Sequence, residues 1–359
     1  MINLKLGCNF DFELIDRVYE LNSTYVNAQI KELYGSDRDH AILSARPNYR
    51  LPDVSLGEME KFISKCHKIG VSFNYTMNTP YPGSKQWISR EAEGIYKFIG
   101  ELENIGTETL TVANPLLAQL IREKSSTIGI EVSAVANISS VTEIKAWDDH
   151  YNISKVCTSL YKNRSFKFLE TAAKLCSDSG IKITLLANEF CSTGGVKDSY
   201  STSCIFRQSC YLCHSANRSK TDDLLLKGYP MSQCMVSRSH DSSWLKCQFI
   251  RPEDLSYYSE LGITQFKITG RTGSTDYISF IASVYMREEW QGNLLMLWKP
   301  LQTIRSGSNE LSHQHPAFID NTKLSNFLGF WKNNKSHECS NELCGKTCKY
   351  CDDYFKKMP

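Results

Sequence analysis

Residues 166–191 read FKFLETAAKLCSDSGIKITLLANEFC, and they contain one complete unit of the pattern that decides the fold. Apolar residues recur at helical spacing over Phe166–Ser179, and a β-rich run follows over Ile181–Leu186. The run is followed by two polar residues, Asn188 and Glu189. The same order of helix, short strand and polar strand end recurs through most of the first 290 residues. This alternation predicts parallel βαβ units in an α/β protein.

Eight strands are predicted in this part of the chain, and eight favour a closed barrel over an open sheet. They are Ile2–Gly7, Thr24–Ala28, Val71–Tyr75, Thr109–Val112, Gly129–Val135, Ile153–Val156, Ile181–Leu186 and Gln265–Thr269. Helical patterns between them include Leu56–Ile69, Arg90–Ile105 and Pro252–Leu261. We therefore expect a (β/α)8 TIM-like barrel over residues 1–290, with a cysteine-rich insertion (188–250) after the seventh strand. A C-terminal extension (291–359) with a cysteine-rich tail follows the barrel.

Composition and charge are those of a globular protein, and they disfavour a nucleic-acid-binding or membrane-spanning one. Hydrophobic residues make up 41% of the 359 residues and charged residues 22%, which is enough to bury a real core. The formal charge of +2 supplies no basic field, so bulk nucleic acid is disfavoured as a partner. No apolar run approaches the roughly 18 residues of a membrane span, and the N-terminus lacks the regions of a signal peptide. We expect a cytoplasmic protein.

In a reducing cytoplasm, clustered cysteines more often bind metal or do redox work than form disulfides. Within the insertion, five of the 14 cysteines are clustered between residues 191 and 234, and Cys247 lies further on. The five are Cys191, Cys204, Cys210, Cys213 and Cys234. Thiolates are soft ligands that suit zinc or an iron–sulfur cluster. The spacings are long and uneven, unlike the paired C-x-x-C of a zinc ribbon. We favour a cluster at this position over zinc, and over a set of scattered loop thiols.

The tail holds four more cysteines, Cys339, Cys344, Cys348 and Cys351, in the spacing C-x4-C-x3-C-x2-C. This density predicts a second metal site, and either a structural zinc or a second cluster fits it. We favour a site separate from the insertion. The alternative is that a tail cysteine supplies the fourth ligand of the insertion's cluster.

Polar residues near the predicted strand ends should converge over the C-terminal mouth of the barrel. They are Asn74, Tyr75 and Asn78 at the third strand, Glu189 after the seventh, Arg271 after the eighth and Arg46 after the second. The two arginines can clamp a carboxylate or phosphate, with the asparagines and the tyrosine as further substrate contacts. Glu189 can act as a general base or orient a metal ligand. The alternative is that Arg271 and Glu189 simply pair with each other.

Several motifs are distributed along the chain: VSFNYTMN at 71–78, NEFC at 188–191, Cys204-x-x-Arg207, FIRPEDL at 249–255 and FKITGR at 266–271. Together they resemble the collagenase-like peptidases of unassigned catalytic type, family U32, and most closely an iron–sulfur branch of it. The resemblance covers most of the chain. It implies an α/β barrel and a four-iron, four-sulfur cluster bound by Cys191, Cys204 and Cys234, with Cys210 or Cys213 as the fourth ligand. The sequence departs from the pattern in a longer gap before Cys204 and in Ile205, where proline is usual.

The better-understood members of that family are oxygen-independent hydroxylases. The resemblance therefore implies an iron–sulfur oxidoreductase that hydroxylates an organic substrate at the barrel mouth, or carries out a related oxygen-atom transfer. A metal-assisted peptidase is disfavoured because no Ser-His-Asp order, H-E-x-x-H helix or G-x-S-x-G elbow is present. A third reading is a non-catalytic iron–sulfur protein that carries electrons or assists a partner enzyme. The expected partners are a small-molecule or peptide substrate, and an electron donor or partner protein.

Overall fold

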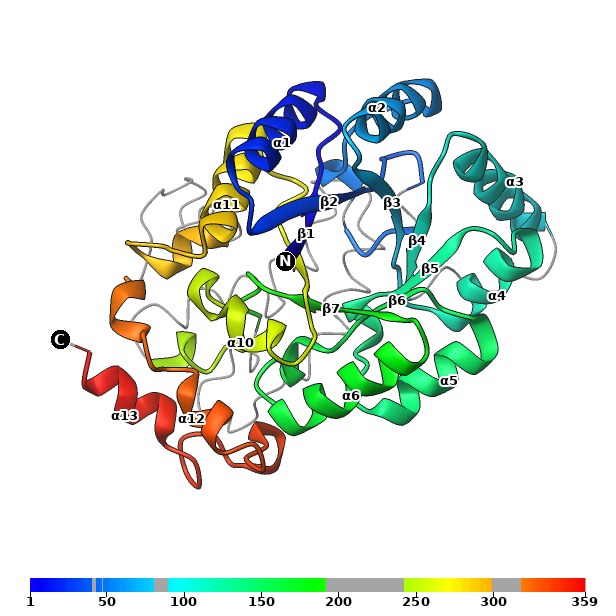
Figure 1. Cartoon of the computed structure of the whole chain (residues 1–359). Helices are drawn as coiled ribbons and strands as arrows, with labels where there is room; N and C mark the ends of the chain where they lie inside the picture. The colour runs from blue at the N-terminus through cyan, green and yellow to red at the C-terminus, as the bar shows by residue number, and fades with distance from the viewer. Residues whose placement is uncertain (41–42, 47, 81–89, 192–241, 299–317, 359) are drawn as a thin grey trace, which may run out of the picture.

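The computed structural model describes residues 1–40, 43–46, 48–80, 90–191, 242–298 and 318–358. Eight parallel strands close into a barrel in sequence order, with helices forming an outer ring (Figure 1). The strands are β1 (Ile2–Gly7), β2 (Ala28–Gly35), β3 (Ser72–Met77), β4 (Thr109–Val112), β5 (Gly129–Val132), β6 (Lys155–Cys157), β7 (Lys182–Leu186) and β8 (Gln265–Ile268). The predicted (β/α)8 TIM-like barrel is confirmed.

The helices of the ring bury an apolar face against the strands, and α1, α2, α4, α5 and α11 begin at a side-chain cap. They are α1 (Phe12–Thr24), α2 (Leu56–Lys68), α3 (Arg90–Asn104), α4 (Pro115–Lys124), α5 (Val141–Tyr151), α6 (Phe166–Asp178), α10 (Leu255–Ser259) and α11 (Thr275–Arg287). In α2, for example, Ser55 and Glu58 form a reciprocal capping box, and Met59, Phe62 and Ile63 are buried. Apolar spacing therefore places each helix on the barrel wall.

One predicted strand is wrong. Thr24–Ala28 was expected to be the second strand, but Thr24 ends α1 and β2 begins at Ala28. The Asp11 carboxylate caps the helix by accepting from Glu13 N, and Leu14, Ile15 and Val18 bury its apolar face. This helical spacing extends α1 to Thr24, before the alternating residues of β2 begin. Arg46 still lies in the loop after the second strand.

The C-terminal extension packs on the outside of the barrel. Its helices α12 (Gly329–Asn333) and α13 (Tyr350–Lys356), orange and red in Figure 1, lie beside α10. Lys332 Nζ lies 2.9 Å from Glu260 Oε2, and Lys335 pairs with Glu170 of α6. Within the described ranges, no helix combines the length and the apolar character that crossing a membrane requires.

Candidate functional site

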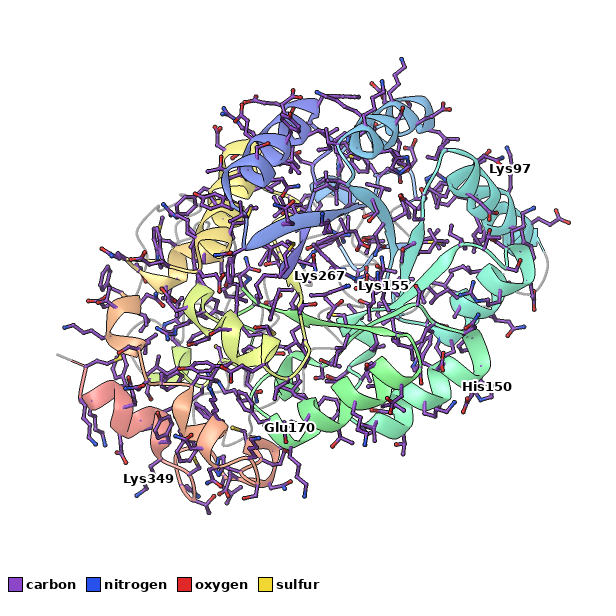
Figure 2. All side chains as sticks on the ribbon, in the orientation of Figure 1. Lys97, His150, Lys155, Glu170, Lys267 and Lys349 are labelled. Atoms are coloured by element: carbon purple, nitrogen blue, oxygen red, sulfur yellow. The ribbon has the colours of Figure 1, made fainter. Side chains whose placement is uncertain are left out.

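The interior of the barrel is polar, whereas most barrels of this type are filled by branched apolar side chains. Lys5 Nζ lies 2.9 Å from Glu131 Oε2 and 3.5 Å from Glu32 Oε1. Lys155 also bonds to Glu32, and Lys267 Nζ lies 3.8 Å from Glu131 Oε1. Figure 2 shows Lys155 and Lys267 toward the centre of the ring of strands. Three ammonium groups thus face two carboxylates, which leaves an excess positive charge inside the barrel.

These interior groups stay charged despite their burial. Burial alone raises the pKa of Glu131, but the charges of Lys267, Lys5 and Lys155 outweigh it and hold that pKa at about 2. Burial lowers the pKa of Lys5, and the carboxylates of Glu131 and Glu32 outweigh it, so the net shift is upward. The network is therefore a set of paired ions and not a set of neutralised groups.

Arg271 follows β8 and lies buried at the C-terminal mouth. One terminal nitrogen donates to Ser44 Oγ at 3.0 Å, and the other, Nη1, has no partner. Burial, and then the charge of Arg46, lower the pKa of Arg271 to about 10. The guanidinium is still protonated at neutral pH, so the mouth contains a buried cation that faces a second cation and has no counter-ion among the residues that the structure describes.

The backbone holds Arg271 in this position. A Cβ at Gly7 would lie 2.8 Å from both Cβ and N of Arg271, so β1 approaches β8 closely only because Gly7 has no side chain. Tyr34 at the end of β2 donates its hydroxyl to Ile268 O at 2.8 Å, and Lys267 Nζ lies 4.1 Å from the Tyr34 ring centroid. The ends of β1, β2 and β8 are thereby joined beneath the guanidinium.

The predicted substrate-binding residues fall into two groups. Arg46 is half-buried near Arg271, and Asn78 accepts from Ala45 N at 3.2 Å and donates to Ser133 Oγ at 3.3 Å, which ties the Arg46 loop to the barrel. Asn74 and Tyr75 are fully buried inside β3, which continues to Met77 because its residues go on alternating between the two faces. These two side chains support the barrel and its loops.

The contacts of the two buried residues show how they do so. Asn74 donates to Glu131 Oε2 at 2.6 Å and to Glu32 Oε1 at 3.0 Å, and it accepts from Thr111 Oγ1. Tyr75 donates its hydroxyl to Asp37 Oδ1 at 3.1 Å. All polar groups of Asn74 are thus engaged inside the protein. The role of either residue as a direct substrate contact stays a prediction.

The chain after β7 lies alongside the chain after β8. Asn188 accepts from Thr269 N at 2.6 Å, and its amide donates to Thr269 O at 3.1 Å and to Leu297 O at 2.8 Å. These hydrogen bonds place Glu189 and Cys191 at the same edge of the barrel as Arg271. Both residues are half-buried. Glu189 and Arg271, both described, form no ion pair with each other. Cys204, Cys210, Cys213 and Cys234 lie outside the described residues.

Phe190, the residue before Cys191, packs in a cluster of aromatic rings. The Phe190 ring stacks on Phe249 at 4.8 Å between centroids, and Trp298 and Trp244 lie at 5.8 and 6.4 Å. Cys247 is buried beside it, with its sulfur 3.0 Å from Phe190 O. A cysteine sulfur thus lies at the rim of the mouth, next to a cluster of aromatic rings. This surrounding suits a sulfur-ligated metal group, whose redox behaviour depends on burial and hydrogen bonding.

Sequence reasoning missed the interior ions and a carboxylate–histidine pair near the mouth. Asp37 is buried and accepts from Tyr75, from His40 N at 2.8 Å and from His40 Nδ1 at 2.9 Å. The His40 ring stacks on Phe98 at 3.5 Å. In the described part of the chain, no Ser, Thr or Cys side chain bonds to this histidine, so the pair has no nucleophile beside it. The interior ions could have been recognised in the sequence, because the charged residues Lys5, Glu32 and Glu131 interrupt strands that are otherwise largely apolar.

Comparison with known proteins decides the family. The model of "Peptidase family U32" matches residues 22–289, which is most of the chain. The chain belongs to peptidase family U32. A relative of this U32 chain, the "Uncharacterized protease MJ1657" of Methanocaldococcus jannaschii, is 26% identical over 303 residues, which cover 84% of this chain and 81% of that protein.

Similar solved structures include the U32 peptidase Mk0906, at 11% identity and a TM-score of 0.49, covering 75% of this chain and 94% of that one. Another is an HpcH/HpaI aldolase from Desulfitobacterium hafniense, at 9% identity and a TM-score of 0.31, covering 63% of this chain and 90% of that one.

The tail of this U32 chain lies beyond the residues that the family model matches. Its four cysteines, Cys339, Cys344, Cys348 and Cys351, line one small cavity together with Arg164, Lys246, Trp331 and Glu342. Over the described ranges, no three His, Cys, Asp or Glu side chains are already gathered at metal-binding distances. The four sulfur atoms therefore border the same cavity, but they do not lie close enough together to coordinate a single ion.

Proposed function

We propose that the barrel mouth binds an organic substrate through a carboxylate or phosphate group held by Arg271 and Arg46. We propose further that the enzyme hydroxylates this substrate without dioxygen: an oxygen-atom donor other than dioxygen gives up its oxygen atom and is reduced by two electrons, and the substrate is oxidised by the same two electrons. The observation that carries the first part is the buried Arg271 guanidinium, whose Nη1 has no hydrogen-bond partner and which pairs with no carboxylate of the described residues.

The energetics favour an anion at this place. A buried charge without a partner costs several kcal/mol, and the like charge of Arg46 adds to the cost. The excess positive charge inside the barrel has the same sign. An anionic group between the two arginines would offset the cost of burying Arg271, the repulsion from Arg46 and the excess positive charge of the barrel interior. Hydrogen bonds to charged groups contribute roughly 1.5–3 kcal/mol each.

The redox part rests on Cys191 and on the resemblance of the insertion to the iron–sulfur branch. Cys191 would hold the cluster with Cys204, Cys234 and either Cys210 or Cys213. Such a cluster supplies electrons or an open iron that acts as a Lewis acid. The chain's own residues would do the rest: Arg271 and Arg46 orient the substrate, and Glu189 accepts a proton or orients a ligand.

A peptidase is the second candidate, because the family and the Methanocaldococcus jannaschii relative carry that name. Arg271 would then bind a carboxylate of a peptide. The Asp37–His40 pair could orient a water molecule as a general base does. Hydrolysis of casein by cluster-free protein, abolished in His40→Ala and retained in Cys191→Ala, would favour this candidate over the hydroxylase.

The anion site is tested by titrating the protein with sulfate, as a phosphate-shaped probe, and with acetate. Calorimetry should show that Arg271→Gln weakens the binding of at least one probe roughly tenfold or more, because charged hydrogen bonds are lost. Arg287→Gln, at an exposed position at the end of α11, is the matched control and should bind as the wild type does. Equal affinities in all three proteins would contradict the proposal.

The cluster is tested by analysing iron and sulfide in protein purified without oxygen. We expect about four irons and equal sulfide per cluster. Cys191→Ala, Cys204→Ala and Cys234→Ala should each lose both. The matched controls are Cys66→Ala and Cys176→Ala, which remove buried helix thiols and should retain iron and sulfide. A colourless wild-type preparation that contains only zinc after reconstitution would refute the cluster.

A further inference from the structure

The four tail cysteines are brought together by a compact fold of residues 339–351. Cys339 begins a short 3-10 turn, and Cys351 lies in the first turn of α13. Cys344 and Cys348 flank a tight turn in which Gly345 N donates to Cys348 O at 2.8 Å. Gly345 has φ +86°, a conformation that glycine adopts readily and other residues rarely do.

Other side chains and the barrel complete the surroundings of the four sulfurs. Trp331 Nε1 donates to Cys339 Sγ at 3.2 Å, and Cys351 Sγ donates to Leu245 O at 3.5 Å. The cavity that all four thiols line has a volume of about 10 Å³. That is close to the space that one water molecule needs.

Arg164 is a buried cation at this cavity, with only 2% of its surface exposed. It donates to Leu245 O at 2.8 Å and to Cys247 O at 2.5 Å, and Nη1 lies 4.0 Å from Cys351 Sγ. Its Nε has no partner, and no described carboxylate pairs with it. Lys246, in contrast, is paired with Asp352 at 2.8 Å. The buried guanidinium therefore lacks a counter-ion, and thiolates are the groups placed to supply one.

We propose that Cys339, Cys344, Cys348 and Cys351 bind a single zinc-type divalent ion that fastens the C-terminal extension to the barrel. The spacings of four, three and two residues fall within the range of structural zinc sites. A cavity of water-molecule size suits a single ion. Four thiolates around a divalent ion carry an excess negative charge, which Arg164 neutralises in part. Because the sulfurs are not yet at metal-binding distances, binding draws them together.

The tail site is separate from the barrel mouth. Cys191 does not line the cavity of the four tail thiols. The segment that carries Leu245 and Cys247 lies between them, since Leu245 O accepts from Cys351 while the Cys247 sulfur contacts Phe190 O. A tail metal can therefore be gained or lost independently of a group at the mouth.

The test compares the full-length wild type with the double variant Cys344→Ala/Cys348→Ala, both purified under reducing conditions. Elemental mass spectrometry should find that the double variant loses about one zinc per chain. Cobalt substituted into the wild type should show the intense absorption of tetrahedral thiolate coordination, and the double variant should not. Cys66→Ala and Cys176→Ala are the matched controls, and Cys191→Ala should keep the tail metal.

A chelator provides a readout that does not depend on how well a variant folds. It should lower the Tm of the wild type and leave the Tm of the double variant unchanged, because only a bound metal adds folding free energy. Equal zinc in the two proteins would overturn the proposal. Loss of iron and sulfide in place of zinc from the double variant would also overturn it, since the tail would then serve a cluster.

Discussion

Arg251, Arg271 and Arg164 are all buried arginines, and they differ in their partners. Arg251 forms a two-pronged pair with Asp254, at 2.8 and 2.7 Å, which is the usual way to stabilise a buried guanidinium. Arg271 has a serine hydroxyl and Arg164 has two carbonyl groups, but neither has a carboxylate. Among the described residues, Arg271 and Arg164 thus lack the carboxylate that Arg251 has, although the Arg164 guanidinium also lies 4.5 Å from the Trp331 ring centroid.

The pKa of Arg271 leads to a prediction about pH. Its value of about 10 lies below the usual 12.5, so the guanidinium loses its proton, and its attraction for an anion, as the pH rises through 10. Sulfate keeps its charge over this range. Its affinity should be constant between about pH 7 and 9 and should fall above pH 10. Calorimetry on protein shown by circular dichroism to be folded measures this, and a constant affinity to pH 11 would contradict it.

At the scale of elements, each strand presents apolar residues to the helices and polar residues to the barrel interior. Phe73 and Tyr75 of β3 face outward, and Asn74 between them bonds to carboxylates from β2 and β5. The alternation follows from the two-residue period of a strand. The interior ions therefore link strands that are far apart in the sequence.

Glu131→Gln should destabilise the barrel by about 3–5 kcal/mol, because Lys5 and Lys267 would lose a buried counter-ion. Urea unfolding at neutral pH measures this, and exposed Glu93→Gln is the matched control, expected within about 0.5 kcal/mol of wild type. The pKa of Glu131 is lowered from 4.5 to about 2. Its stabilising contribution is therefore complete above pH 4.5 and is lost as the pH falls toward 2. A gap between wild type and variant that widens in acid would contradict this account.

At the scale of the whole molecule, the C-terminal extension is held by aromatic packing as well as by its cysteines. The Tyr350 ring stacks on Phe330 at 4.2 Å and on Phe327 at 5.6 Å, and Tyr354 packs edge-on against Phe327 at 5.0 Å. Trp331, beneath them, is buried. Removal of the tail therefore exposes apolar surface whether or not a metal is bound.

Truncation after Trp331 should lower the Tm by more than the double variant Cys344→Ala/Cys348→Ala does. Each large buried side chain stabilises the fold by about 1.5–3 kcal/mol, and the truncation uncovers several. Scanning calorimetry in the presence of a chelator separates the two effects, because packing alone then distinguishes the proteins. An equal Tm for wild type and truncated protein under chelator would show that the tail contributes no packing.

The double variant also decides whether the tail and the mouth share a metal group. If the sites are separate, iron bound through Cys191 should be unchanged in Cys344→Ala/Cys348→Ala. If a tail cysteine completes the cluster at the mouth, its iron content and absorption should be lost.

Much of the fold could be predicted from the sequence, because a strand or helix is specified by the period of its own residues. The patterns predicted Thr109–Val112 and Ile2–Gly7 with the observed bounds. They failed at Thr24–Ala28, where β-branched and aromatic residues close a helix that begins thirteen residues earlier at its Asp11 cap. A helix that begins at a cap so far upstream is easily overlooked when only the residues around Thr24–Ala28 are considered.

The sequence by itself determined the barrel, the family and the types of residue at the strand ends. Only the tertiary structure decided that the Asn74 amide is hydrogen-bonded inside the barrel, that Arg271 has no counter-ion in the described part of the chain, and that Arg164 lies at the tail thiols. The reason is physical. The face of a strand or helix on which a side chain lies follows from the periodicity of the neighbouring residues. The residues that this side chain contacts depend on strand register, barrel closure and the docking of distant segments. These bring together residues as far apart in the sequence as Arg164 and Cys351.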